Sequence, residues 1–170
     1  MKKAMINYMK NEKNDELYTP DYAIEPLLKY LPKNKIIWEC TDFGSSNITK
    51  LLKQHDYKVI STHKDNFDFL TDIPNFDFDI IITNPPYSLK NEFLKKCYEY
   101  DKPFCLLLPL TSLEGIERGK MFREKGIDVL VLDRRCDFMD NKKSNWFNTS
   151  WFCYKVLPKQ LIFEELHKGE

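Results

Sequence analysis

The residues best suited to chemistry follow a buried strand that stops at two prolines. Asp79 precedes three isoleucines and a threonine, and Asn84-Pro85-Pro86-Tyr87 comes directly after them. The β-branched run predicts a buried strand, and the double proline predicts a rigid turn at its carboxyl end. Because two prolines remove two backbone donors and fix two φ angles, the carbonyls of Asn84 and Pro85 cannot be used in a helix or a sheet ladder. An amide, a carbonyl and an aromatic ring at this place suit a planar molecule that carries an NH2 group.

The tetrapeptide from Asn84 to Tyr87 resembles the hallmark of class I S-adenosylmethionine-dependent methyltransferases that act on exocyclic or amide nitrogen. In that family, Asn/Asp-Pro-Pro-Tyr/Phe follows the fourth strand. The resemblance implies a doubly wound, mostly parallel seven-stranded α/β sheet with one antiparallel strand near its edge. It also implies S-adenosyl-L-methionine as the cofactor and the N6 amino group of adenine in DNA as the preferred target. Adenine in RNA and a protein glutamine are alternative targets, and a non-catalytic accessory subunit is an alternative role.

The resemblance also implies how the tetrapeptide would act. The side-chain oxygen of Asn84 and the carbonyl of Pro85 would accept the two N–H groups of the target amine, with Pro86 fixing the turn. This would localise the nitrogen lone pair toward the methyl group and stabilise the positive charge that develops on nitrogen. Tyr87 would stack on the base, which must leave a duplex or be single-stranded. The reaction requires neither a metal nor a covalent nucleophile.

A second candidate segment runs from Lys35 to Ser46 and reads as strand, small-residue turn and helix, with Ser45 or Ser46 as the helix cap. In the resembled family this turn cradles the methionine and ribose part of the cofactor, which nominates Asp42 and Gly44. Glu39 holds the acidic position that would receive the cofactor's ammonium group. The family usually has two or three glycines in this loop, whereas only Gly44 stands here.

Three further positions follow from the same resemblance. Thr19, in a Thr-Pro pair, would lie by the methionine carboxylate, although it could equally cap the helix that begins at Pro20. Asp68 and Phe69 resemble the Asp-Phe-Leu segment that holds the cofactor's adenine. After the second expected strand, 57–62, the family has an acid for the ribose, whereas this chain has His63.

A polar loop between the last two expected strands is the candidate substrate surface. It combines basic and aromatic residues, which suits phosphate together with a stacked base. A solvated hairpin loop with an apolar anchor is an equal alternative. The residues nominated for substrate binding, besides Tyr87, are Arg134, Arg135, Lys142, Lys143 and Trp146.

The remaining pattern alternates strands with helices and shows no repeat or linker. A helix is expected after Ser88 as its cap, and another after the capping-box spacing of Thr111 and Glu114, ending at Gly126. Residues 161–163 are expected to pack as a tail. The other expected strands are 103–109, 128–133 and 148–157.

Composition limits the possible classes. The 170 residues predict one domain over 17–170, preceded by a mobile arm over 1–16, with no room for a separate target-recognition domain. Lys plus Arg equals Asp plus Glu at 26 each, which argues against binding nucleic acid by bulk charge and leaves a local basic patch as the alternative. Besides nucleic acid, the partners considered include a separate specificity or partner subunit. Five scattered cysteines without CxxC spacing predict reduced thiols and no zinc site. Without a long apolar run or a signal-type core, we expect a cytoplasmic protein with no membrane partner.

Overall fold

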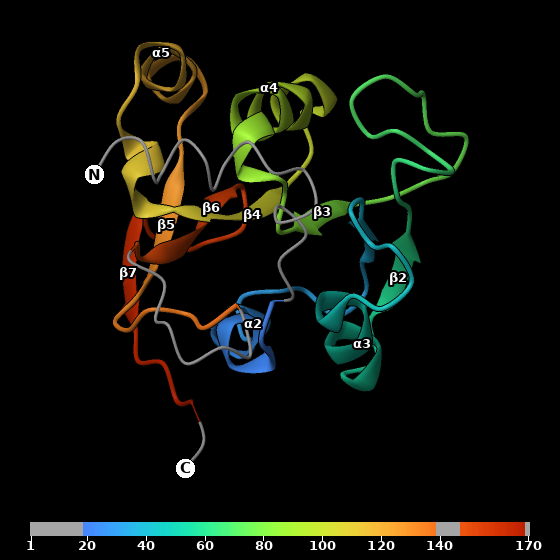
Figure 1. Cartoon of the computed structure of the whole chain (residues 1–170), viewed down its shortest axis with the longest axis horizontal. Helices are drawn as coiled ribbons and strands as arrows, with labels where there is room; N and C mark the ends of the chain where they lie inside the picture. The colour runs from blue at the N-terminus through green and yellow to red at the C-terminus, as the bar shows by residue number, and fades with distance from the viewer. Residues whose placement is uncertain (1–18, 139–146, 169–170) are drawn as a thin grey trace.

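The computed structural model describes residues 19–138 and 147–168. They form a seven-stranded sheet with two helices on each face (Figure 1). The arm expected over 1–16 and the loop residues Lys142, Lys143 and Trp146 lie outside the described residues.

The sheet has the order β2-β1-β3-β4-β6-β5-β7. All neighbouring strands run parallel except β6, which is antiparallel to both β4 and β5. The prediction of a doubly wound, mostly parallel sheet with one reversed strand is therefore confirmed. The carboxyl ends of β1, β3, β4 and β5 meet at one edge of the sheet, which we call the carboxyl edge. The strands are β1 Ile36–Glu39, β2 Lys58–Ser61, β3 Ile80–Thr83, β4 Phe104–Pro109, β5 Asp128–Leu132, β6 Thr149–Tyr154 and β7 Leu161–Glu164.

Two hydrophobic clusters fill the space between the sheet and its helices. Helices α2 (Asp21–Leu28) and α3 (Asn47–Gln54) cover one face, and α4 (Lys90–Tyr100) and α5 (Ile116–Lys125) cover the other (Figure 1). The strands β3 and β4 are buried along their whole length, as expected for strands that are covered on both faces.

The sheet departs from the resembled family at one place and from the expected pattern at another. Residues 62–79 form no helix or strand, so the tetrapeptide follows the third strand of this chain, whereas in the resembled family it follows the fourth. This segment is instead held by aromatic rings that pack on Trp38, with centroid distances of 5.1 Å to Phe69 and 4.8 Å to Phe78. The tail over 161–163 is not merely packed, because it pairs with β5 and supplies the seventh strand.

Several helix caps were predicted wrongly. Pro20 stands at the N-cap of α2, because the side chain of Thr19 accepts a hydrogen bond from Asn84 instead of capping the helix. Ser88 lies inside a 3-10 turn, η2 (Tyr87–Leu89), and α4 begins after Leu89 without a side-chain cap. The expected capping box falls in another 3-10 turn, η3 (Leu110–Leu113), and Gly115 at φ 130° starts α5.

Two caps were predicted correctly. Ser46 accepts from the backbone N–H of Thr49 at the start of α3, and Gly126 at φ 84° ends α5. Both depend on residues only a few positions apart, which is the range that a local pattern can predict.

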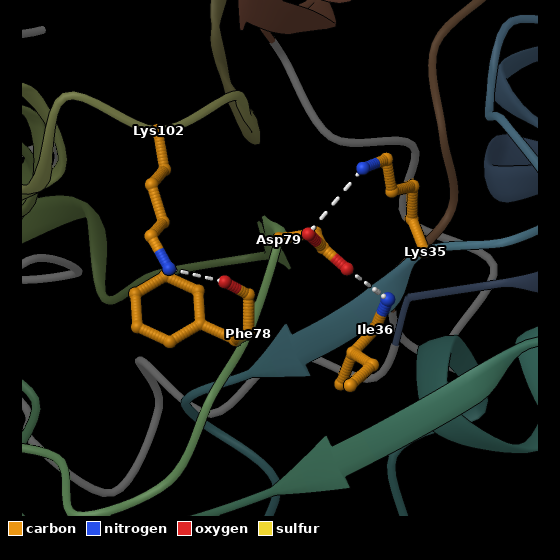
Figure 2. Close-up of polar contacts among 5 residues, drawn as sticks. All are labelled: Lys35, Ile36, Phe78, Asp79 and Lys102. Atoms are coloured by element: carbon orange, nitrogen blue, oxygen red, sulfur yellow. Dashed lines mark hydrogen bonds and ion pairs between the residues drawn. The ribbon is translucent and has the colours of Figure 1, made fainter.

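The opposite, amino edge of the sheet is tied by Asp79 (Figure 2). Its carboxylate accepts from the backbone N–H of Ile36 at 2.8 Å and lies 3.5 Å from the ammonium of Lys35. Next to it, Lys102 donates to the carbonyl of Phe78 and lies 4.1 Å from the centre of that ring. The N–H of Ile36 lowers the pKa of Asp79, with help from Lys35.

Candidate functional site

A cavity of about 240 Å³ opens at the carboxyl edge, beside the end of β3. Its walls come from the segment before α2, the turns after β1, β2 and β3, and the segment 68–70, so five stretches of chain converge on it. Six of the residues nominated from the sequence line this cavity: Thr19, Glu39, Asp68, Phe69, Asn84 and Pro86.

Glu39 lies at the end of β1 and is 1% exposed. One carboxylate oxygen accepts from the hydroxyl of Thr83 at 2.6 Å and from the N–H of Thr41 at 3.0 Å, and the other accepts from the hydroxyl of Ser46 at 2.6 Å. Burial raises the pKa of Glu39 more than these donors lower it. Within the described part of the chain, no lysine, arginine or histidine forms an ion pair with it. The site therefore holds a desolvated carboxylate that a cationic ligand would stabilise.

Asp42 performs a different task in the same turn. Its carboxylate accepts from the backbone N–H groups of Gly44 and Ser46 at 2.7 and 3.0 Å and from the hydroxyl of Thr49 at 2.6 Å. These donors outweigh burial and lower the pKa of Asp42. Gly44 takes φ 105°, which a side chain would strain. Neither Asp42 nor Gly44 is among the residues that line the cavity; Asp42 fixes the shape of the turn that does.

Asn84 and Thr19 are in contact at the carboxyl end of β3, although 65 positions separate them in the sequence. The side-chain nitrogen of Asn84 donates to the hydroxyl of Thr19 at 3.1 Å, and this bond orients the amide. The backbone carbonyl of Asn84 accepts from the hydroxyl of Thr41 at 3.4 Å. This carbonyl is used in neither a helix nor a sheet, but it already has a partner inside the protein.

The side of the cavity near β2 holds Asp68, Phe69 and His63. The Asp68 carboxylate accepts from the backbone N–H of Leu70 at 2.9 Å, which closes a local turn. Phe69 is 2% exposed and stacks on Phe93 with a centroid distance of 4.9 Å, so most of its ring belongs to the core. His63 Nδ1 lies 3.1 Å from the carboxylate of Asp65, which holds the imidazole at the end of β2.

The remaining nominated residues are more widely placed. Pro85 and Tyr87 are buried, and the Tyr87 ring meets Phe147 edge-on at 5.8 Å, while Pro86 lines the cavity. Arg134 and Arg135 are exposed after β5, so they lie at the same sheet edge as Asn84, and Arg135 donates to the side chain of Asn148 at 3.2 Å. Lys142, Lys143 and Trp146 fall outside the described residues.

Sequence reasoning missed the hydroxyl groups around Glu39. Thr41, Ser46 and Thr83 come from three places in the chain, and only the fold brings Thr83 to Glu39, 44 positions away. A weak signal was present, because Thr83 ends an otherwise apolar strand immediately before Asn84.

No protein-family model matches this sequence, and no curated protein matches it. Among solved structures, it is similar to a protein named as a modification subunit of a type I restriction enzyme from Vibrio vulnificus, at 10% identity and a TM-score of 0.54. That match covers 99% of this chain but 51% of the other, so this chain spans about half the length of that subunit. It is also similar to a protein named as a class I S-adenosylmethionine-dependent methyltransferase from Listeria monocytogenes, at 14% identity and a TM-score of 0.54, over 97% of this chain and 72% of the other.

Proposed function

We propose that this chain is a class I methyltransferase that moves a methyl group from S-adenosylmethionine to an exocyclic amino nitrogen, with N6 of adenine in DNA as its target. Its fold is that of the class I methyltransferases. The observation that carries the proposal is that Asn84, the first residue of an Asn-Pro-Pro-Tyr turn, and the buried Glu39 line one cavity at the carboxyl edge. Open α/β sheets bind their ligands at this edge.

The residues fit the cofactor on chemical grounds. Glu39 is a buried carboxylate among hydroxyl donors, and the ammonium group of the cofactor would supply the positive charge that offsets its desolvation. Thr19 and the turn shaped by Asp42 would flank the methionine part, and Asp68 with Phe69 would hold the adenine. When bound, the cofactor supplies an electrophilic methyl group on a sulfonium.

Asn84 and Pro85 would act on the target amine. The bond that the Asn84 amide donates to the Thr19 hydroxyl fixes the orientation of that amide. The Asn84 side-chain oxygen would then accept one N–H of the target, and the Pro85 carbonyl would accept the other. Acceptors that are already in place favour the positive charge that develops on nitrogen. Holding the two reactants in line supplies much of the remaining rate enhancement. Tyr87, buried against Phe147, would need to turn toward the base in order to stack on it.

A nucleic acid is preferred over a protein substrate because Arg134 and Arg135 lie at the same sheet edge as Asn84, where they would contact phosphate. A separate specificity subunit would supply the sequence recognition. The similarity to a protein named as a modification subunit of a restriction enzyme supports this arrangement. Among residues 19–138 and 147–168, no helix is long and apolar enough to cross a membrane.

Two tests separate the proposal from its alternatives. The first is a thermal shift with S-adenosylmethionine, since a ligand at 100 times its Kd adds about 2.7 kcal/mol to the stability. The absence of a shift would favour an accessory subunit that does not bind the cofactor. This is the main alternative, because the turn after Glu39 has one glycine, Gly44, and His63 stands where the resembled family has an acid. The second is incorporation of labelled methyl groups into DNA, RNA and protein of a lysate from cells that lack the gene. Label in RNA or protein alone would reject the DNA substrate.

A further inference from the structure

The last strand, β7, leaves one side of the sheet open. Among the described residues it pairs only with β5, and it forms the border of the sheet in Figure 1. Its two faces differ. Ile162 packs against the core, and Glu164 bonds to Lys29 and Tyr30. On the other face Leu161 is 54% exposed and Phe163 is 70% exposed.

The backbone of β7 faces outward at the same two residues. The carbonyls of Gln160 and Glu164 accept from Val129 at 2.8 Å and Asp133 at 3.1 Å, so the even-numbered residues point their backbone groups toward β5. Because these directions alternate along a strand, the N–H and C=O groups of Leu161 and Phe163 point to the open edge. In most proteins a lysine, a proline or a bulge on an exposed edge strand prevents it from pairing with a strand of another molecule. In β7, the two residues whose backbone groups point outward, Leu161 and Phe163, are apolar.

The charges at the two ends of the strand are complementary. Lys159 precedes β7 and Glu165 follows it, and both are exposed. Among the described residues, the Glu165 carboxylate lies 3.7 Å from Nε2 of His167, and both side chains are exposed. A partner strand that runs antiparallel therefore needs an acid opposite Lys159, an apolar centre, and a base opposite Glu165. Residues 159–165 of a second copy of this chain meet that requirement.

We propose that two copies of this chain pair antiparallel through β7, with a two-fold axis at Ile162. In this register Leu161 of each copy faces Phe163 of the other, and these outward residues exchange about four backbone hydrogen bonds. Lys159 of each copy then lies opposite Glu165 of the other. If the register is shifted by two residues in one direction, Leu161 lies opposite Glu165. If it is shifted by two residues in the other direction, Lys159 lies opposite Phe163. Of these three registers, the one centred on Ile162 pairs charge with opposite charge and apolar residue with apolar residue. The contact is isologous and joins the two sheets into one.

The contact is independent of the proposed methyl transfer. Three strands, β4, β6 and β5, separate β7 from β3 and the Asn84 cavity, so pairing leaves that cavity accessible. Because the strand has only four residues, the interface is small, and we expect a weak dimer that forms at high protein concentration.

Sedimentation equilibrium of the full chain over a wide concentration range tests the proposal. We expect a monomer–dimer equilibrium that Phe163→Lys abolishes, because this change puts a charge opposite Leu161 without touching the core. Ile116→Lys is the matched control, since Ile116 is a 93% exposed apolar residue on α5, and it should leave the equilibrium unchanged. The thermal shift with S-adenosylmethionine should be the same in both variants, which shows that they are folded and separates this inference from the proposed function.

Charge exchange tests the register itself. Lys159→Glu or Glu165→Lys alone should weaken association by up to about tenfold, since each places like charges opposite one another at both ends of the contact. The double variant with both changes should restore it. A parent that stays monomeric at every concentration, a dimer that survives Phe163→Lys, or a double variant no better than the singles would overturn the proposal.

Discussion

The two edges of this sheet each hold a carboxylate at a strand end, and the two groups are treated in opposite ways. At the carboxyl edge, Glu39 is 1% exposed, is bonded to hydroxyl and amide donors, and has its pKa raised by burial. At the amino edge, the Asp79 side chain is 38% exposed, it bonds to a backbone N–H and a lysine, and its pKa is lowered (Figure 2).

The difference separates a carboxylate that stabilises the fold from the one that we propose binds a ligand. Asp79 ties β1 to the start of β3 in solvent, where its charge costs little desolvation. Glu39 is buried in the wall of a cavity without a cationic partner among the described residues, which reduces the stability of the free protein. A costly charge beside a cavity is a physical indicator of a ligand site.

The largest effect is expected from the carboxyl edge. Asn84→Ala should lower methyl transfer by at least about a hundredfold, because it removes the acceptor that we propose stabilises the charge developing on the target nitrogen. Cofactor affinity should stay within about threefold, since that acceptor does not touch the cofactor. Kinetics and a calorimetric titration measure both quantities, and an equal loss of cofactor binding would contradict the assignment.

A smaller effect concerns the charge of Glu39. Glu39→Gln should weaken S-adenosylmethionine by roughly tenfold or more, because it removes a charged partner of the ammonium group. The pKa of Glu39 is raised in the free protein, so the group is partly protonated above the ordinary carboxyl range, and cofactor affinity should rise as pH rises through the raised value. Titrations from the ordinary carboxyl pKa upward should show this rise in the parent and not in Glu39→Gln. The same slope in both proteins would place the ammonium elsewhere.

The adenine end of the cavity should respond more mildly. Asp68→Ala should weaken S-adenosylmethionine and S-adenosylhomocysteine alike, since the two share the purine. His63→Asp should tighten both if an acid at the end of β2 is the missing ribose ligand. Calorimetry with the two ligands checks this, and unchanged affinity in both variants would move the cofactor away from this wall.

The smallest effect is expected at the amino edge. Asp79→Asn should lower the free energy of unfolding by about 0.5 to 1 kcal/mol near neutral pH and leave cofactor binding unchanged. Because the pKa of Asp79 is lowered, its contribution is present above the unfolded pKa and is lost as pH falls through the folded value. Parent and variant should therefore converge in acid, as urea unfolding at several pH values would show. A constant difference would mean that the charge of Asp79 plays no part.

The sequence predicted those parts of the site that depend on short stretches of chain. The strand before Asn84, the turn after Glu39 and the cap at Ser46 each involve neighbouring residues, and each lies where the pattern puts it. The bond between Thr19 and Asn84 and the hydroxyl of Thr83 on Glu39 join residues far apart in the chain, so no local pattern could specify their geometry. The caps at Thr19 and Ser88 failed for a related reason, since tertiary contacts and a 3-10 turn replaced the local signal.

The aromatic packing of residues 62–79 gives the molecule an optical reporter. Trp38 donates its indole N–H to Thr62 at 2.8 Å and packs against Phe69, which follows Asp68 at the cavity wall. Trp151 is buried on the opposite face, where it donates to the carbonyl of Ala23. Ligand binding at Asp68 would change the surroundings of Trp38 while leaving those of Trp151 the same. Fluorescence of a variant that keeps Trp38 as its one tryptophan, with Trp146→Phe and Trp151→Phe, should therefore follow occupancy of the adenine end of the cavity. Fluorescence of a variant that keeps Trp151 instead, with Trp38→Phe and Trp146→Phe, should not.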